Sequence, residues 1–156
     1  MERIALFPGS FDPFTIGHES IVRRALPLFD KIIIGVGFNT LKKTLLSVEN
    51  RERMIKDVFA GEKRVEVTKF QGLTVDYCKT IGAKYILRGL RTAADFEYER
   101  AIGQMNKTMK PELETVFLLT STEYTPVNST IVRDIIIFGG DASKFLPKGI
   151  DIKKYL

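Results

Sequence analysis

The sequence has no tryptophan, one cysteine and one histidine among its 156 residues. One cysteine cannot form an intramolecular disulfide, and so few thiols and imidazoles leave no cluster to hold zinc. Cys78 lies in a short helical pattern, where we expect a packed apolar side chain rather than a nucleophile. No apolar run approaches the roughly 20 residues of a membrane helix, and an apolar strand is predicted almost from the first residue. We therefore expect no membrane contact, no signal peptide and a cytoplasmic location.

Positively charged residues are only mildly in excess over negatively charged ones. The net charge is +5 and the isoelectric point is about 9.3, which suits phosphorylated ligands as well as nucleic acid. There is no continuous basic stripe with interleaved aromatic residues, so we expect no nucleic-acid partner. Two familiar phosphate loops are also missing, because the chain has neither G-x-x-x-x-G-K-[ST] nor G-x-G-x-x-G. These absences argue against a P-loop protein and against dinucleotide redox chemistry.

Strand-like and helix-like patterns alternate along the whole chain. Strands are predicted over 4–7, 31–38, 64–70, 84–87 and 116–119. Helices are predicted over 17–29, 47–59, 74–81, 92–110 and 128–138, the first of them broken near Pro27. The near-continuous apolar run over 31–38 is typical of a parallel strand covered on both faces. We expect an α/β fold in one domain over 1–156, with a doubly wound five-stranded parallel sheet and helices on both faces.

The loop between the first strand and the first helix, from Gly9 to His18, carries the strongest signal for a functional site. It carries the only histidine at a helix start, where free N–H groups and the helix dipole attract anions. Ser10 and Thr15 add hydroxyl groups nearby. The loop therefore indicates a phosphate site.

Polar residues follow every predicted strand, and in a parallel sheet these positions share one edge. They are Ser10 and His18, then Asn39, Thr40, Lys42 and Lys43, then 71–74, then Arg88 to Arg91, and finally the hydroxyl-rich segment 121–130. One imidazole, two ammonium groups and two guanidinium groups would then converge, which is the composition of a polyphosphate site.

Several of these side chains have plainer interpretations. Lys42 and Lys43 could be a solvated pair, and we expect only one of them to be a ligand. Glu97 and Glu99 could be plain helix surface. On the same helix, apolar side chains recur at helical spacing, and we expect Tyr98 and Met105 in the core: the face comprises Tyr98, Ala101, Ile102, Met105 and Met109.

Two motifs carry a family resemblance that spans nearly the whole chain. Thr15-Ile16-Gly17-His18, preceded by Pro8-Gly9-Ser10-Phe11-Asp12-Pro13, fits the [TH]-x-G-H signature of the nucleotidylyltransferase superfamily. The segment from Arg88 to Glu99, RGLRTAADFEYE, resembles the bacterial phosphopantetheine adenylyltransferase family in particular. Asn106, the PELE sequence at 111–114 and the FLP sequence at 145–147 add to this resemblance.

The resemblance implies a Rossmann-like nucleotidylyltransferase fold and transfer of the adenylyl group of ATP to 4'-phosphopantetheine. The products would be dephospho-coenzyme A and pyrophosphate, a step of coenzyme A biosynthesis. It also implies Mg²⁺ on the ATP phosphates, a homohexamer, and binding of dephospho-coenzyme A and coenzyme A.

The resemblance also implies roles for individual residues. Four would act at the reacting centre: His18, Lys42, Arg88 and Arg91. ATP would be bound by Ser10, Phe11, His18, Gly89, Leu90, Arg91, Glu99, Tyr124, Thr125, Pro126, Val127, Asn128, Ser129 and Thr130. The second substrate would be bound by Ser10, Lys42, Leu73, Thr74, Arg88 and Asn106.

Three positions depart from the family pattern. Ser10 stands where threonine is common but keeps a hydroxyl, Phe7 stands where tyrosine is frequent, and Asn128 replaces a usual serine. Three other functions stay open on the sequence alone. They are a nucleotidylyltransferase acting on nicotinamide mononucleotide or a cytidylyl acceptor, a non-catalytic nucleotide sensor on the same fold, and a nucleic-acid module.

Overall fold

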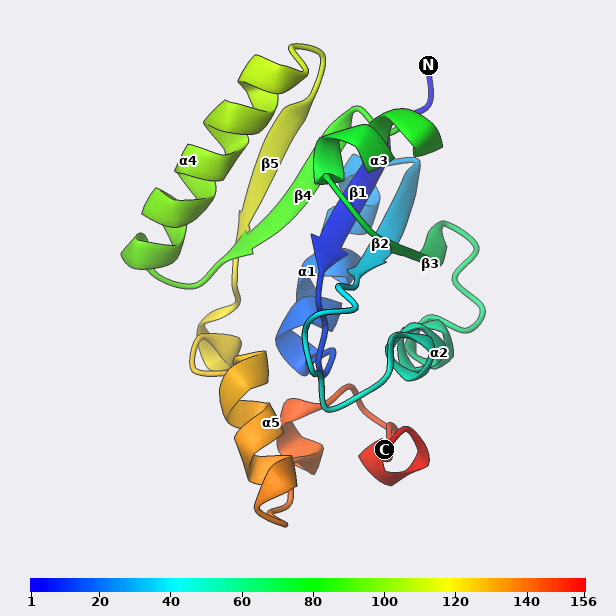
Figure 1. The fold of residues 1–156 in the computed structure, drawn as a ribbon, viewed down its shortest axis with the longest axis vertical. Helices are drawn as coiled ribbons and strands as arrows, with labels where there is room; N and C mark the ends of the chain where they lie inside the picture. Colours follow the sequence, from blue (N-terminus) through cyan, green and yellow to red (C-terminus); the bar gives the residue numbers. More distant parts are fainter.

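The computed structural model describes residues 1–156 and contains one five-stranded sheet (Figure 1). Its strands are β1 (Ile4–Gly9), β2 (Lys31–Gly37), β3 (Val65–Phe70), β4 (Tyr85–Leu90) and β5 (Glu114–Leu119). The strand order is β3-β2-β1-β4-β5 and every neighbouring pair is parallel. The predicted doubly wound α/β fold is confirmed.

Helices cover both faces of the sheet. They are α1 (Ile16–Ala25), α2 (Val48–Val58), α3 (Thr74–Ile81), α4 (Ala93–Met109) and α5 (Ser129–Ile137). Alternate residues of β1 divide the core: Ala5 and Phe7 pack with α1 and α2, whereas Leu6 packs with α3 on the opposite face. On the face of α3, α4 lies along β4 and β5, and α5 lies beyond the carboxyl ends of the strands (Figure 1).

Local sequence signals set most helix ends. The side chains of Thr15, Ser47, Thr92 and Asn128 each accept a hydrogen bond from a backbone N–H in the first turn. Gly82 ends α3 with φ +70°, a left-handed conformation that glycine adopts without a steric penalty. Pro27 lies in a short 3-10 turn over 26–28, so α1 ends at Ala25 rather than continuing to Phe29.

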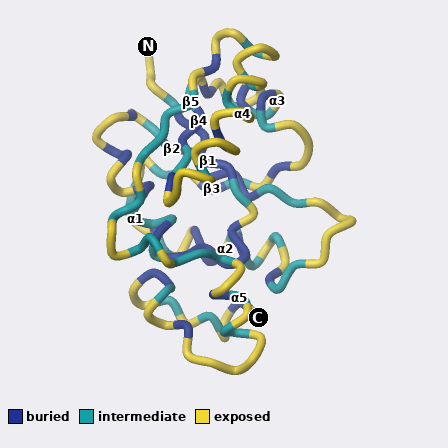
Figure 2. Tube along the Cα trace, turned by 90° about the vertical axis from the view of Figure 1, so that its left-hand side faces the viewer, coloured by how far each residue is buried: buried dark blue, intermediate teal, exposed yellow.

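Two predictions about the second half of the chain are wrong. The fourth strand continues to Leu90, which places Arg88 inside the strand rather than after it. Tyr98 and Met105, expected in the core, are 69% and 62% exposed. Helical spacing shows that apolar side chains share a face but does not show what covers that face. Figure 2 shows α4 as largely exposed, and Glu99 is its only buried residue.

The core is otherwise conventional. Cys78 is fully buried, and burial raises the pKa of its thiol to about 11, in keeping with a packed, unreactive side chain. The carboxyl-terminal segment is fastened to α2, since the Tyr155 hydroxyl donates to Asp57 and the Arg53 guanidinium donates to the Lys154 carbonyl. None of the helices combines the length and the apolar character needed to cross a membrane.

Candidate active site

The candidate site lies at the carboxyl ends of β1 and β4, where the order of the strands reverses. Strand β1 pairs with β2 over its whole length, but it pairs with β4 only at Ala5 and Leu6. Pro8 has no N–H to donate to a neighbouring strand, and the two strands are not paired beyond Leu6. Crevices at such reversals are the usual ligand sites of open α/β sheets.

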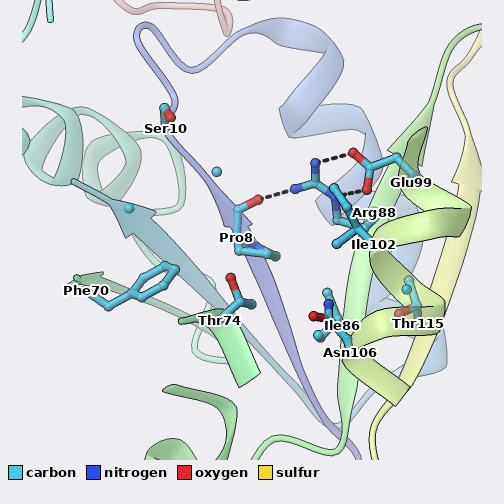
Figure 3. A pocket seen from close by; sticks show the side chains of 13 residues that line it. Pro8, Ser10, Phe70, Thr74, Ile86, Arg88, Glu99, Ile102, Asn106 and Thr115 are labelled. Atoms are coloured by element: carbon cyan, nitrogen blue, oxygen red, sulfur yellow. Dashed lines mark hydrogen bonds and ion pairs between the residues drawn. The ribbon is translucent and has the colours of Figure 1, made fainter. Parts of the chain in front are cut away.

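Two cavities occupy this crevice. The larger, about 460 Å³, lies between the 9–18 loop, the end of β4 and the start of α5. The smaller, about 240 Å³, lies between β1, β4 and α4 (Figure 3). Four residues border both: Pro8, Gly9, Ser10 and Arg88. A third cavity, about 190 Å³, contains Lys42 and is also bordered by Ser10. Ser10 therefore lies where all three spaces meet.

His18 is held as a neutral imidazole by its position in the first turn of α1. The Thr15 backbone N–H donates to His18 Nδ1 over 2.9 Å, so Nδ1 must be unprotonated and the ring proton lies on Nε2. Burial, together with the charges of Arg88 and Arg91, lowers the pKa of His18 to about 3. The side chain is thus suited to donate a hydrogen bond from Nε2 and not to act as a base.

Arg88 is held in place by a buried carboxylate. Its Nε and Nη2 donate to the two oxygens of Glu99 over 2.8 and 2.6 Å, and its Nη1 donates to the Pro8 carbonyl over 2.6 Å (Figure 3). A guanidinium has five N–H groups, so two remain for a ligand. This bidentate pair fixes the plane of the guanidinium at the boundary of the two cavities.

Side chains from other elements donate hydrogen bonds to four carbonyl groups of the 9–18 loop and of the strand before it. The pairs are Arg88 to Pro8, Arg51 to Ser10, Arg133 to Asp12 and Ser129 to Pro13, at 2.6, 2.6, 2.7 and 2.9 Å. In a trans peptide the next N–H points away from the carbonyl. The Phe11 N–H has no hydrogen-bond partner in the protein and is available to an anion.

The larger cavity gathers most of the residues predicted to bind ATP. Those lining it are Ser10, Phe11, His18, Gly89, Arg91, Val127, Asn128, Ser129 and Thr130. Those that do not line it are Leu90, Glu99, Tyr124, Thr125 and Pro126. Leu90 is buried, and Glu99 instead borders the smaller cavity as the partner of Arg88.

The residues predicted for the second substrate divide between two spaces. Ser10, Thr74, Arg88 and Asn106 border the smaller cavity. Lys42 borders the third cavity, whereas Lys43 borders none of the three. Leu73 borders none of them and is 60% exposed.

Sequence reasoning missed the charged residues that hold the loops. Asp12 is 4% exposed, and its carboxylate accepts from the backbone N–H groups of Leu45 and Leu46 over 2.9 and 2.8 Å. It thereby joins the 9–18 loop to the loop that carries Lys42. The neighbouring motif residues gave a signal for Asp12, but none pointed to Arg51 or Arg133, which lie far away along the chain.

Comparison with known proteins decides the family. A family model described as cytidylyltransferase-like matches residues 6–135. A phosphopantetheine adenylyltransferase from Flavobacterium psychrophilum is 50% identical over 97% of this chain and 99% of its own length. One from Leptospira biflexa is 51% identical over 94% of this chain and 92% of its own length. The chain belongs to the phosphopantetheine adenylyltransferase family. It is therefore a nucleotidyltransferase.

Solved structures support the fold. A bifunctional NMN adenylyltransferase/ADP ribose pyrophosphatase from Francisella tularensis, complexed with AMP and a Mn ion, matches 98% of this chain with a TM-score of 0.69. The sequence identity is 24%, so this likeness concerns the fold alone. The match covers 46% of that protein, so the chain spans about half the length of this two-activity relative.

Proposed function

We propose that this chain transfers the adenylyl group of ATP to the phosphate of 4'-phosphopantetheine, forming dephospho-coenzyme A and pyrophosphate. The observation that carries the proposal is the meeting of two cavities at Ser10 and Arg88, in a chain of this family. A reaction between two bound phosphates needs such a shared boundary, and a sensor of a single nucleotide does not. Alignment of two bound reactants can supply roughly 7–11 kcal/mol of catalysis.

In the proposed arrangement ATP occupies the larger cavity and the pantetheine arm the smaller one. The arm lies along Thr74 and Asn106, and its phosphate reaches Lys42 and the free N–H groups of Arg88. Arg91 and the start of α5 hold the nucleotide. The carboxylate of Glu99 positions Arg88 rather than contacting the nucleotide.

The chemical step needs charge stabilisation more than proton transfer. An oxygen of the 4'-phosphopantetheine phosphate forms a bond to the α-phosphorus, and the bond from that phosphorus to the bridging oxygen of pyrophosphate breaks. The nucleophile is already anionic, so no general base is required. His18 Nε2–H donates to the α-phosphate as its charge grows, together with Lys42, Arg88 and Arg91. Removal of one such preorganised donor typically costs about 10²–10³ in rate.

Mg²⁺ is proposed as the partner of the ATP phosphates. Nowhere in the structure do three or more His, Cys, Asp or Glu side chains gather closely enough to hold a metal ion. The proposed ion would be held mainly by phosphate oxygens and water, as Mg²⁺ prefers. When bound it would neutralise phosphate charge, while the protein supplies the surrounding N–H donors.

The decisive experiment measures both directions of the reaction with purified protein and Mg²⁺. We expect pyrophosphate release from ATP with 4'-phosphopantetheine, and ATP formation from dephospho-coenzyme A with pyrophosphate. Nicotinamide mononucleotide and a cytidylyl acceptor serve as control substrates. If the protein turns over neither 4'-phosphopantetheine nor dephospho-coenzyme A, the proposal is refuted. Turnover of a control substrate would then assign the chain to that substrate.

We further propose a cytoplasmic homohexamer that also binds coenzyme A in the same crevice. Large apolar side chains are exposed on two helices, which suits faces buried between subunits: Tyr98, Met105 and Met109 on α4, and Ile131 and Ile137 on α5. Sedimentation velocity tests the assembly, with a single species of six chains expected. Competition between coenzyme A and ATP in an equilibrium-binding assay tests the shared site.

A further inference from the structure

Arg51 is a buried cation without a role in the reaction as proposed so far. It lies in the second turn of α2 and is only 3% exposed. Burial lowers the pKa of its guanidinium, and the charges of Asp12 and Glu49 oppose that effect. Its Nη1 donates to the Ser10 carbonyl over 2.6 Å and to the Gly37 carbonyl over 3.0 Å, while its Nε has no partner. Burying such a group is costly, so the contacts it makes are informative.

The two carbonyls belong to neighbouring strand ends. The β1–β2 ladder ends with the pair Gly9 and Val36, and the same register would next pair Ser10 with Gly37. No backbone hydrogen bond joins those two residues. The Arg51 guanidinium bridges both carbonyls instead, so a side chain takes the place of the next step of the ladder.

This bridge fixes the peptide that follows Ser10. That peptide is trans, so its N–H, which belongs to Phe11, points away from the held carbonyl. Phe11 borders the larger cavity and has φ +50°, a left-handed conformation that costs a non-glycine residue roughly 1–2 kcal/mol. A conformation of this kind persists only where its surroundings hold it.

We propose that Arg51 is a positioning residue for adenylyl transfer. By holding the Ser10 carbonyl, it keeps the Phe11 N–H and the Ser10 hydroxyl aimed at the phosphates that meet at the boundary of the cavities. The inference rests on the proposed function. It differs from a purely structural role because displacement of this peptide lowers turnover more than it lowers substrate binding.

The test compares three variants with the wild type. Arg51→Met removes the hydrogen-bond donors but keeps a long side chain. Arg51→Lys keeps the charge but not the planar, forked arrangement of donors. Arg53→Met is the matched control, since Arg53 lies in the same helix and also donates to a backbone carbonyl, at 2.6 Å, but on the carboxyl-terminal segment. We measure kcat and both KM values, thermal stability, and amide hydrogen exchange of peptides covering 9–18.

For Arg51→Met we expect kcat to fall about 10²-fold, the effect of a misplacement near 1 Å, with each KM changing much less. Arg51→Lys should recover part of that loss, and Arg53→Met should keep the wild-type kcat. Exchange over 9–18 should rise in Arg51→Met and stay unchanged in Arg53→Met.

Equal kcat in Arg51→Met and Arg53→Met, or unchanged exchange over 9–18, would overturn the inference. If Arg51→Met does not fold, the decision passes to Arg51→Lys, for which a wild-type kcat with wild-type exchange is the refuting result. An inactive wild type would refute the proposed function alone, and the exchange data would still decide whether Arg51 orders the loop.

Discussion

Lowering the pH from 7 to 5 should destabilise this protein through one identifiable group, His18. The chain has a single histidine, so imidazole titration can be assigned without ambiguity. Burial, assisted by the charges of Arg88 and Arg91, lowers the pKa of His18 from 6.5 to about 3 in the folded protein. Below pH 6.5 the unfolded chain takes up a proton that the folded chain does not bind. The stability that neutral His18 supplies is therefore full above pH 6.5 and is lost as the pH falls toward 3.

The size of the effect follows from the two pKa values. Linkage between 6.5 and about 3 makes the loss about 2 kcal/mol between pH 7 and pH 5. At lower pH the slope approaches about 1.4 kcal/mol per pH unit. Carboxylates also take up protons as the pH falls, so a variant without the imidazole is needed to separate the contribution of His18 from theirs. His18→Gln serves because its amide oxygen can still accept from the Thr15 N–H, and it cannot be protonated in this range.

Urea unfolding of both proteins at pH 7, 6 and 5 measures the difference. The wild type should lose about 2 kcal/mol more than His18→Gln across this range. An NMR titration of the single imidazole adds a direct reading, and its carbon shifts should stay constant from pH 7 to 5. If the two proteins lose stability in parallel, or if the imidazole titrates near 6.5, the neutral Nε2–H form deduced from the Thr15 hydrogen bond is wrong.

Three further outcomes are expected. Lys42→Ala should lower kcat about 10²-fold, as for loss of one preorganised donor, and raise KM for 4'-phosphopantetheine, whereas Lys43→Ala should match the wild type; equal effects would remove Lys42 from the site. Glu99→Gln should lower kcat/KM for the same substrate about tenfold or more, because a neutral amide cannot hold Arg88 in two charge-assisted hydrogen bonds; unchanged kinetics would contradict the positioning role. Cys78 should resist a thiol reagent in the folded protein and react quickly in urea, while fast labelling of folded protein would contradict its burial.

Local signals allowed much of the fold to be predicted. The hydroxyl caps at Ser47 and Thr92 and the glycine at 82 depend on neighbours within one turn, and the structure has all three where the sequence indicates them. Apolar runs indicated four of the strands, and the alternation of Val65 and Val67 indicated the third. Thr15 was not predicted as the cap of α1, and the tautomer of His18 was not predictable, because it depends on which ring atom meets the Thr15 N–H.

The end of β4 could not be predicted because distant partners determine it. Arg88 and Gly89 resemble a loop in sequence, yet the parallel ladder with β5 continues through both. A side chain at Gly89 would place its Cβ 3.0 Å from the side chain of Ile21, so any other residue there would require Ile21 to shift where α1 passes close to the strand. The pairing of Arg88 with Glu99 likewise depends on how α4 packs back onto the sheet, which no local pattern specifies.

The helix α4 was predicted correctly, but its apolar stripe was wrongly expected in the core. Its apolar stripe has the spacing of a core-facing helix, but Gly103 is the point of close approach to the sheet, where a Cβ would lie 3.2 Å from Thr115. The large side chains of Tyr98 and Met105 lie away from that contact and remain exposed. The small residue, and not the apolar stripe, marks the face of α4 that packs against the sheet.

The two sides of β1 show how one proline and two arginines convert the end of a sheet into a site. Pro8 cannot continue the hydrogen-bond ladder toward β4, and the strands separate there. Arg88 then satisfies the Pro8 carbonyl on the β4 side, and Arg51 satisfies the Ser10 carbonyl on the β2 side. Arg88 retains two N–H groups at the boundary of the two larger cavities, whereas Arg51 borders only the third cavity, is 3% exposed and has its Nη1 on two backbone carbonyls. One guanidinium is therefore placed to bind substrate, and the other to hold the backbone that binds it.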